Sequence, residues 1–223
     1  MAVPYNTELI ETLSMILIIT SVAAVESQNL KRAAAAYCLQ ALLICGLILA
    51  FAAGNSALYV WALTALITKA ILTPWFLLRY IAKTGEQEVP AIVGFGPSVV
   101  IASVLLVSFY KLTHTYVHVL APTPEAIAGV FRTNLAVALT VFVLGLYAIL
   151  SRRDAIKTVI GLCLLENAVH LSLVSLAPDM RETALIGIAT EVVVTVYLLL
   201  YVIAGIHEKV GTTDTYELAE LHW

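Results

Sequence analysis

The sequence predicts an all-α membrane protein, a polytopic bundle of about seven transmembrane helices, and two observations predict it. Hydrophobic residues make up 61% of the 223 residues and charged residues only 12%, roughly half of their share in soluble domains. The apolar residues also form continuous runs, each about as long as a helix needs to cross the hydrocarbon layer. Since a helix satisfies its own backbone hydrogen bonds, and the alternation typical of β-barrels is missing, these runs indicate membrane-spanning helices.

The apolar runs follow one another along the chain, with short polar segments between them. They lie at about residues 8–25, 33–53, 57–80, 92–112, 130–150, 155–176 and 183–206. The breaks carry typical turn residues, such as Gly54-Asn55-Ser56 and Pro122-Thr123-Pro124. No Lys or Arg precedes the first run, so we interpret it as a retained helix and not as a signal peptide.

We expect a single membrane domain over residues 1–223. It would consist of a four-helix N-terminal part at residues 1–125, a three-helix part at residues 126–210 and a cytoplasmic tail at residues 211–223. The tail mixes acidic residues with aromatic and leucine residues, a composition that can dock on a protein surface. A disordered terminus is the alternative.

The basic residues are distributed unequally between the two ends of the predicted bundle. The loops after the first, third and fifth helices and the C-terminus share one side, which carries Lys31, Arg32, Arg79, Lys83, Arg152, Arg153, Lys157 and Lys209. The other side carries only Lys111, Arg132 and Arg181. Because positive charge stays on the cytoplasmic side, we expect the C-terminus in the cytoplasm and the N-terminus outside a prokaryotic inner membrane.

The sequence offers no ligand set for a cofactor and no surface for nucleic acid. Cys38, Cys45 and Cys163 fall within predicted helices without C-x-x-C spacing, which argues against an iron–sulfur cluster or a disulfide framework. His114 and His118 are four residues apart but lack the further ligands of a closed metal site. The net charge of −3, without a basic patch outside the loops, argues against a nucleic-acid partner.

Three ionisable residues lie near the centres of apolar runs: Lys69, Glu166 and Glu191. Each costs about 2.5–3.5 kcal/mol at mid-bilayer even on insertion scales, so their default interpretation is functional. The alternative is that Lys69 pairs with a glutamate of another helix and only locks the bundle. Two carboxylates and one amine leave one glutamate that must be neutral, hydrated or paired with a neighbouring subunit. A carboxyl group that can be neutral inside the membrane is what a proton relay requires.

Neighbouring side chains extend this set. His170 lies four residues after Glu166, on the same helical face, and the two are a candidate two-step proton element; a satisfied core histidine is the alternative. Thr195 lies four residues after Glu191 and is its candidate hydrogen-bond partner. Asn167 adjoins Glu166 in sequence and is expected to face another direction.

Pro74 predicts a distortion of the third helix close to Lys69. It has no N–H, and its ring displaces the carbonyl of Ala70, the residue that follows Lys69. A kink would expose backbone acceptors at membrane depth, which favours a hydrated interior around Lys69. A kink that serves only packing is the alternative.

Several short motifs together resemble one known family. The segment from Ile160 to Asn167 reads IGLCLLEN, and the segment from Ile186 to Glu191 reads IGIATE. With Ile67-Thr68-Lys69, Pro74 and the tail that begins at Gly211, they resemble the component E subunit of hydrogenase-4-type complexes over nearly the whole chain. The last three helices are also similar to subunit K of respiratory complex I and to component C of Mrp-type antiporters, in which two helices each carry a membrane-embedded glutamate.

This resemblance implies a non-catalytic, non-redox subunit in the membrane arm of a NiFe hydrogenase or formate hydrogenlyase-like respiratory complex. Antiporter-like subunits and a soluble redox arm would be its partners, and the NiFe and iron–sulfur centres would lie in them. Glu166 and Glu191 fall on the family's glutamate positions and would contribute, with Lys69 and His170, to proton or sodium movement. A related complex I-like or Mrp-type assembly, a free-standing secondary transporter and a structural membrane anchor are the alternatives.

Overall fold

A computed structural model describes residues 5–85, 92, 94–121, 129–177 and 181–219. Within these ranges the chain is helical, without a β-strand, which confirms the predicted fold class. The helices are α1 (Thr7–Glu26), α2 (Leu30–Phe51), α3 (Ala57–Ala65), α4 (Thr73–Thr84), α5 (Phe95–Thr115), α6 (Val117–Leu120), α8 (Gly129–Ser151), α9 (Ala155–Leu176), α10 (Glu182–Val210) and α11 (Thr215–Ala219). A π-helical segment, η1 (Leu66–Leu72), joins α3 to α4.

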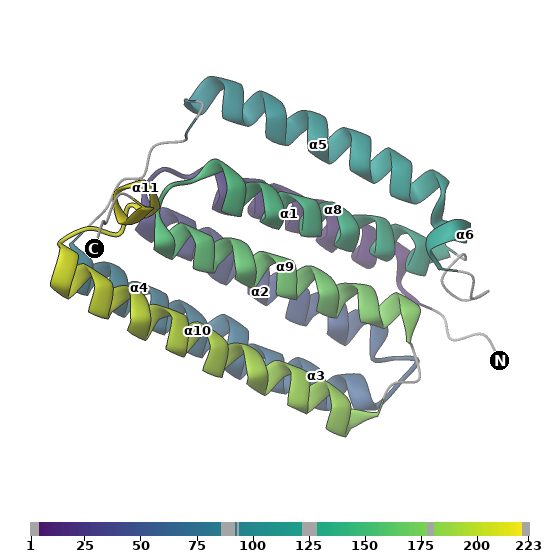
Figure 1. The fold of residues 1–223 in the computed structure, drawn as a ribbon. Coiled ribbons are helices and arrows are strands. Elements are labelled where there is room, and N and C mark those ends of the chain that lie inside the picture. The colour runs from purple at the N-terminus through teal and green to yellow at the C-terminus, as the bar shows by residue number, and fades with distance from the viewer. Residues whose placement is uncertain (1–4, 86–91, 93, 122–128, 178–180, 220–223) are drawn as a thin grey trace.

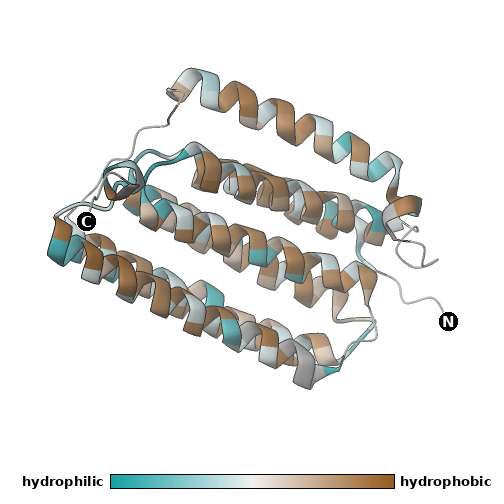
Figure 2. Cartoon of the chain, viewed as in Figure 1, coloured by the Kyte–Doolittle hydropathy of each residue, from teal (hydrophilic) through white to brown (hydrophobic). Residues whose placement is uncertain are grey.

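Seven of these helical stretches are long and apolar enough to cross a membrane, as the sequence predicts. They run side by side along the bundle, and α11 lies near the end opposite to the start of α1 (Figure 1). Apolar residues cover most of their lengths, while hydrophilic residues lie at the ends and at a few positions in the middle of the bundle (Figure 2). Since η1 continues α3 into α4, residues 57–84 form one span.

The helix boundaries follow from capping residues. The side chains of Asn29 and Asp154 accept hydrogen bonds from the backbone N–H groups of Arg32 (3.1 Å) and Lys157 (2.9 Å), which starts α2 and α9. Gly211 ends α10 in the left-handed conformation, with φ at 85°.

Helices α8 and α9 form the closest pair in the bundle, and glycines allow it. A Cβ added at Gly145 would lie 2.9 Å from the backbone nitrogen of Leu165 and 3.0 Å from the carbonyl oxygen of Gly161. A Cβ added at Gly161 would lie 3.1 Å from the carbonyl oxygen of Gly145. Small residues let the two backbones touch, and this contact fixes the position of α9 and of the polar side chains that it carries.

The expected distortion near Lys69 takes the form of η1. The backbone N–H and the hydroxyl of Thr73 both reach the carbonyl of Thr68, five residues earlier. The carbonyl of Ala70, which Pro74 leaves without its usual partner, accepts a hydrogen bond from the Cys38 thiol at 3.4 Å. The predicted kink is therefore a π-helical widening, a feature often found at functional sites.

A buried ion pair closes the end of the bundle that holds the C-terminal tail. The Arg152 guanidinium lies 3.0 Å from the Glu26 carboxylate, and both side chains are buried. The amine of Lys157 donates to the carbonyls of Ala24 (2.5 Å) and Val25 (3.0 Å) in the last turn of α1. We call Glu26, Arg152 and Lys157 the end cluster.

The described part of the tail packs on the chain itself and does not extend free. Residues Asp154 and Asp214 pair in an antiparallel bridge, and the Thr213 hydroxyl contacts the Asp154 carboxylate. The backbone carbonyl of Arg153 accepts a hydrogen bond from the backbone N–H of Thr215 at 2.6 Å. The guanidinium of Arg153 lies 4.0 Å from the centre of the Tyr216 ring. Residues 211–219 of the tail, which were expected to dock on a protein surface, thus dock on this chain's own loop between α8 and α9. Leu221 and Trp223 lie outside the described residues.

Candidate functional site

Three of the four residues predicted for an ion pathway meet in the middle of the bundle. The Lys69 amine, from η1, lies 2.8 Å from Oε1 of Glu166, on α9. Nδ1 of His170, one turn further along α9, lies 2.8 Å from the same oxygen and also contacts the Lys69 amine. We call Lys69, Glu166 and His170 the central cluster.

The members of the central cluster differ in their access to the surface. Lys69 and His170 are buried, whereas the Glu166 side chain is 23% exposed. The indole of Trp61 lies edge-on to the His170 ring, with 5.5 Å between the ring centroids. The cluster is therefore closed on the side of α3 and open at the glutamate.

Sequence reasoning missed two further polar residues. Asn167 Oδ1 accepts a hydrogen bond from the Lys69 amine at 2.9 Å, and its Nδ2 donates to Oε1 of Gln40 at 2.8 Å. Asn167 was expected to face another direction than Glu166, but the Lys69 amine, which reaches them from η1, contacts the polar ends of both side chains. Gln40 is buried on α2, within one of the predicted apolar runs.

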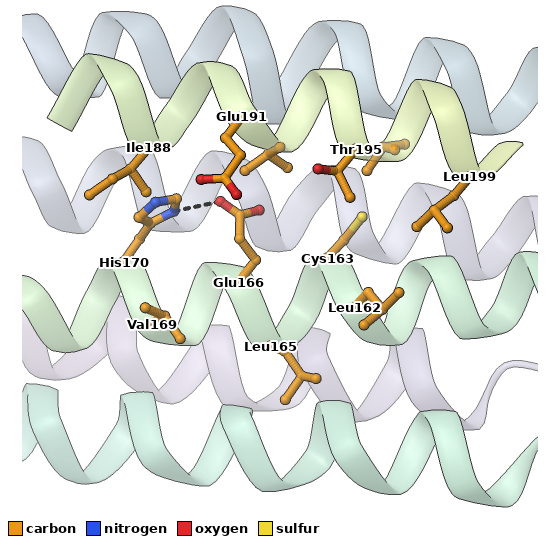
Figure 3. Close-up of a pocket in the computed structure, with 12 residues that line it drawn as sticks. Leu162, Cys163, Leu165, Glu166, Val169, His170, Ile188, Glu191, Thr195 and Leu199 are labelled. Carbon is orange, nitrogen blue, oxygen red and sulfur yellow. Dashed lines mark ion pairs between the residues drawn. The ribbon is translucent and has the colours of Figure 1, made fainter. Parts of the chain in front are cut away.

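The central cluster opens onto a pocket of about 410 Å³ between α9 and α10. Glu166 and Glu191 point toward one another in it, and Thr195 lies one turn beyond Glu191 (Figure 3). The rest of the lining consists mainly of aliphatic side chains. Both glutamates thus share one cavity, although they come from different helices.

Glu191 and Thr195 are exposed in this single chain, on the outward side of the pocket. The hydrogen bond expected between them is not formed: the structure gives none between these two described side chains. At their spacing both side chains face the cavity, and the carboxylate extends toward Glu166 (Figure 3). Thr195 remains a lining residue of the pocket.

The chain is similar to proteins of a known membrane complex. It is 29% identical to hydrogenase-4 component E of Escherichia coli K12 over 215 residues, which cover 96% of this chain and 97% of the relative. The relatives of the same name from Escherichia coli O157:H7 and Shigella flexneri show the same values. No solved structure matches the chain. The predicted resemblance to hydrogenase-4 component E is confirmed.

A second match covers the C-terminal part. Residues 133–223 match the family model of the NADH-ubiquinone/plastoquinone oxidoreductase chain 4L. Glu166, His170 and Glu191 lie inside this region, whereas Lys69 and Gln40 lie outside it. Together with the seven apolar helices, these similarities identify an integral membrane protein of a bacterial inner membrane.

The other polar residues considered from the sequence do not form a comparable site. The His114 ring stacks on Tyr110, with 5.8 Å between centroids, and the His118 ring lies beside Tyr116. Across the described residues, no three His, Cys, Asp or Glu side chains gather in a metal-binding arrangement. Cys45 and Cys163 are buried as free thiols.

Proposed function

We propose that this chain is a non-redox membrane subunit of a complex I-like hydrogenase and contributes to a proton or sodium path coupled to redox chemistry. The full-length similarity to hydrogenase-4 component E supports its place in a multi-subunit membrane complex. Antiporter-like subunits and a soluble redox arm would be its partners, with NiFe and iron–sulfur centres held there. The domain division at residues 126 and 211 belongs to the same proposal.

The observation that carries the proposed pathway is the opening of a buried ion pair onto a pocket with a second carboxylate. Lys69 pairs with Glu166 at 2.8 Å, and Glu191 faces Glu166 across the cavity. A single ammonium neutralises a single carboxylate, so Lys69 leaves one of the two glutamates to be compensated by what else enters the pocket. Such a group at membrane depth is expected to bind a proton or a cation.

The central cluster has the components of a short relay. Glu166 Oε1 lies 2.8 Å from both the Lys69 amine and His170 Nδ1, and these two nitrogens also contact each other. A proton that arrives at Glu166 weakens its pairing with Lys69, because the neutral carboxyl no longer attracts the ammonium. His170 can take up the proton, since an imidazole exchanges protons near neutral pH. Pro74 and η1 hold Lys69 within reach of both groups.

The experiment compares Glu166→Gln, Glu191→Gln and the control Glu208→Gln in the complex reconstituted into vesicles. Glutamine preserves size and most hydrogen bonding but cannot titrate. We expect ion translocation to fall roughly tenfold or more in the first two variants, while redox turnover without a membrane gradient persists. Glu208 lies on the same helix as Glu191 but its side chain is 75% exposed, so its variant should translocate normally.

Two outcomes would contradict the proposal. Normal translocation in both glutamine variants of an intact complex would exclude a relay. Loss of complex assembly before any loss of translocation would favour the structural anchor. Purification of the native complex also decides the assembly type: hydrogenase subunits would support the hydrogenase proposal, whereas NADH-oxidising or Mrp-type subunits, or isolation of the chain alone, would support its alternatives.

A further inference from the structure

A line of hydrogen bonds leads from Lys69 away from the pocket and across three helices. Lys69 donates to Asn167 on α9 at 2.9 Å, and Asn167 donates to Gln40 on α2 at 2.8 Å. Gln40 Nε2 donates to the Ser21 hydroxyl on α1 at 3.4 Å, and this hydroxyl donates to the Leu17 carbonyl at 2.7 Å. All four side chains, from Lys69 to Ser21, are buried.

Both ends of this line fix its direction. A lysine ammonium can only donate, and a backbone carbonyl can only accept. The Asn167 amide must therefore turn its oxygen to Lys69 and its nitrogen to Gln40. If the Gln40 amide were reversed, its N–H₂ group would face the N–H₂ group of Asn167, and its oxygen would face the Ser21 hydroxyl, whose hydrogen is donated to the Leu17 carbonyl. Both ends of the line therefore favour the same orientation of Gln40.

Beyond Lys69, the line contains only amide and hydroxyl side chains. Its two central links are amides, which are neutral donors and acceptors without a titratable group. It ends on a backbone carbonyl in α1. A proton held by the central cluster thus finds no carrier among the described links toward α1, whereas Glu191 faces the cluster on the pocket side.

We infer that Gln40 is a positioning residue for the central cluster: through Asn167 it fixes the Lys69 ammonium and closes the cluster on the side of α1, so that exchange takes place through the pocket between α9 and α10. This inference rests on the proposed function. The titratable groups around Lys69 in the described part of the chain are Glu166, His170 and Cys163 on α9 and Cys45 on α2. Beyond them, Tyr37 on α2 lies beside Cys163 and Asn167, and Glu191 on α10 faces Glu166 (Figure 3). Gln40 acts on them only through the amide of Asn167.

The test uses Gln40→Met and Ser21→Ala in the full complex, with Gln28→Met as control. Methionine matches the length of glutamine but cannot hold the Asn167 amide, and Gln28 is exposed in the loop between α1 and α2. We expect Gln40→Met to assemble, to translocate less, and to move the pH of half-maximal translocation by about half a unit, the worth of one hydrogen bond. Ser21→Ala removes only the far end of the line, so its shift should be smaller.

The outcomes separate this inference from the proposed function. Suppose that Glu166→Gln impairs translocation as expected. A uniform loss of translocation at every pH, or an unchanged pH profile in both Gln40→Met and Ser21→Ala, would then overturn the positioning role of Gln40 alone. Should Gln40→Met fail to assemble, Ser21→Ala decides alone, because the loss of one hydroxyl leaves the packing of α1 intact. Normal translocation in Glu166→Gln would instead remove the proposed function, and this inference with it.

Discussion

The end cluster and the central cluster are both buried ion pairs, and they differ in what surrounds them. The Arg152 and Glu26 side chains are 0% and 7% exposed, and Ser98 donates a further hydrogen bond to Glu26 at 3.0 Å. The partners of Lys157 are backbone carbonyls at the end of α1. Both clusters adjoin a pocket, since Glu26 lines one of about 510 Å³ at the loop between α1 and α2. The central cluster differs because it includes an imidazole and faces a second carboxylate across its pocket.

This difference shows that buried charge alone does not identify a functional site. In the end cluster Arg152 pairs with Glu26 and Lys157 donates to carbonyls of α1, so its groups join α1, the loop after α8 and the start of α9. In the central cluster the glutamate can change partner without a change in the fold, since a cavity lies beside it. A choice of partners across a cavity, here an imidazole and a second carboxylate, is the feature that indicates ion movement.

The largest expected effect concerns the side of the membrane on which the end cluster lies, because a terminus is accessible from one side only. A reporter fused after Trp223 should behave as cytoplasmic, and a tag before Tyr5 should be accessible from outside, because of the asymmetry in Lys and Arg. The result assigns the end cluster to the cytoplasmic side of the membrane. A C-terminus accessible from outside would reverse this assignment.

Removing one partner of the end cluster should have the next largest effect. Arg152→Met leaves the Glu26 carboxylate buried and uncompensated, which costs about 3–5 kcal/mol. We expect little folded chain in the membrane, measured by its yield and thermal stability after solubilisation. The neighbouring Arg153→Met is the control, since Arg153 is exposed, and a normal yield of the Arg152 variant would show that the end cluster is dispensable.

The corresponding change in the central cluster should spare the fold and impair the transport. Lys69→Met also removes one partner of an ion pair, but Glu166 can take up a proton or water from the pocket, so the stability cost should stay below about 3 kcal/mol. Translocation should fall roughly tenfold or more, as in Glu166→Gln. Lys83→Met, on the same span but exposed, is the control. A loss of folded chain as large as in Arg152→Met would remove the distinction between the two clusters.

The smallest expected effect concerns the tail that rests on the end cluster's loop. Thr213→Val removes the hydroxyl that contacts Asp154 and should destabilise the chain by about 1 kcal/mol, with faster proteolysis of the tail as the measurement. Tyr216→Phe, which keeps the ring under Arg153, is the control. Truncation after Lys209 should weaken assembly of the complex further, and unchanged co-purification would show that the tail serves only this chain.

The sequence was sufficient for the spans and for three residues of the central cluster, for physical reasons. Long apolar runs have few alternatives in a membrane, and the i, i+4 spacing of Glu166 and His170 puts both on one face. It was not sufficient for Asn167 and Gln40, because their partners come from other helices and single-helix geometry does not show which faces meet. Arg152 and Lys157 were assigned to topology alone, since a position at a helix end does not show that a side chain turns inward.

The π-helical segment η1 also sets the angular phase of the third span. The buried positions of α3 include Leu58, Trp61 and Ala65, and a regular helix of about 3.6 residues per turn would continue this face near residues 72, 76 and 80. The buried positions found are Thr73, Leu77 and Ile81, each one residue later. The span therefore contains one residue more than its packing face requires, and η1 absorbs it. Deleting one residue between Leu66 and Leu72 would restore a regular helix with both halves still facing the core, whereas the same deletion within α2 or α9 would turn half of the helix toward lipid.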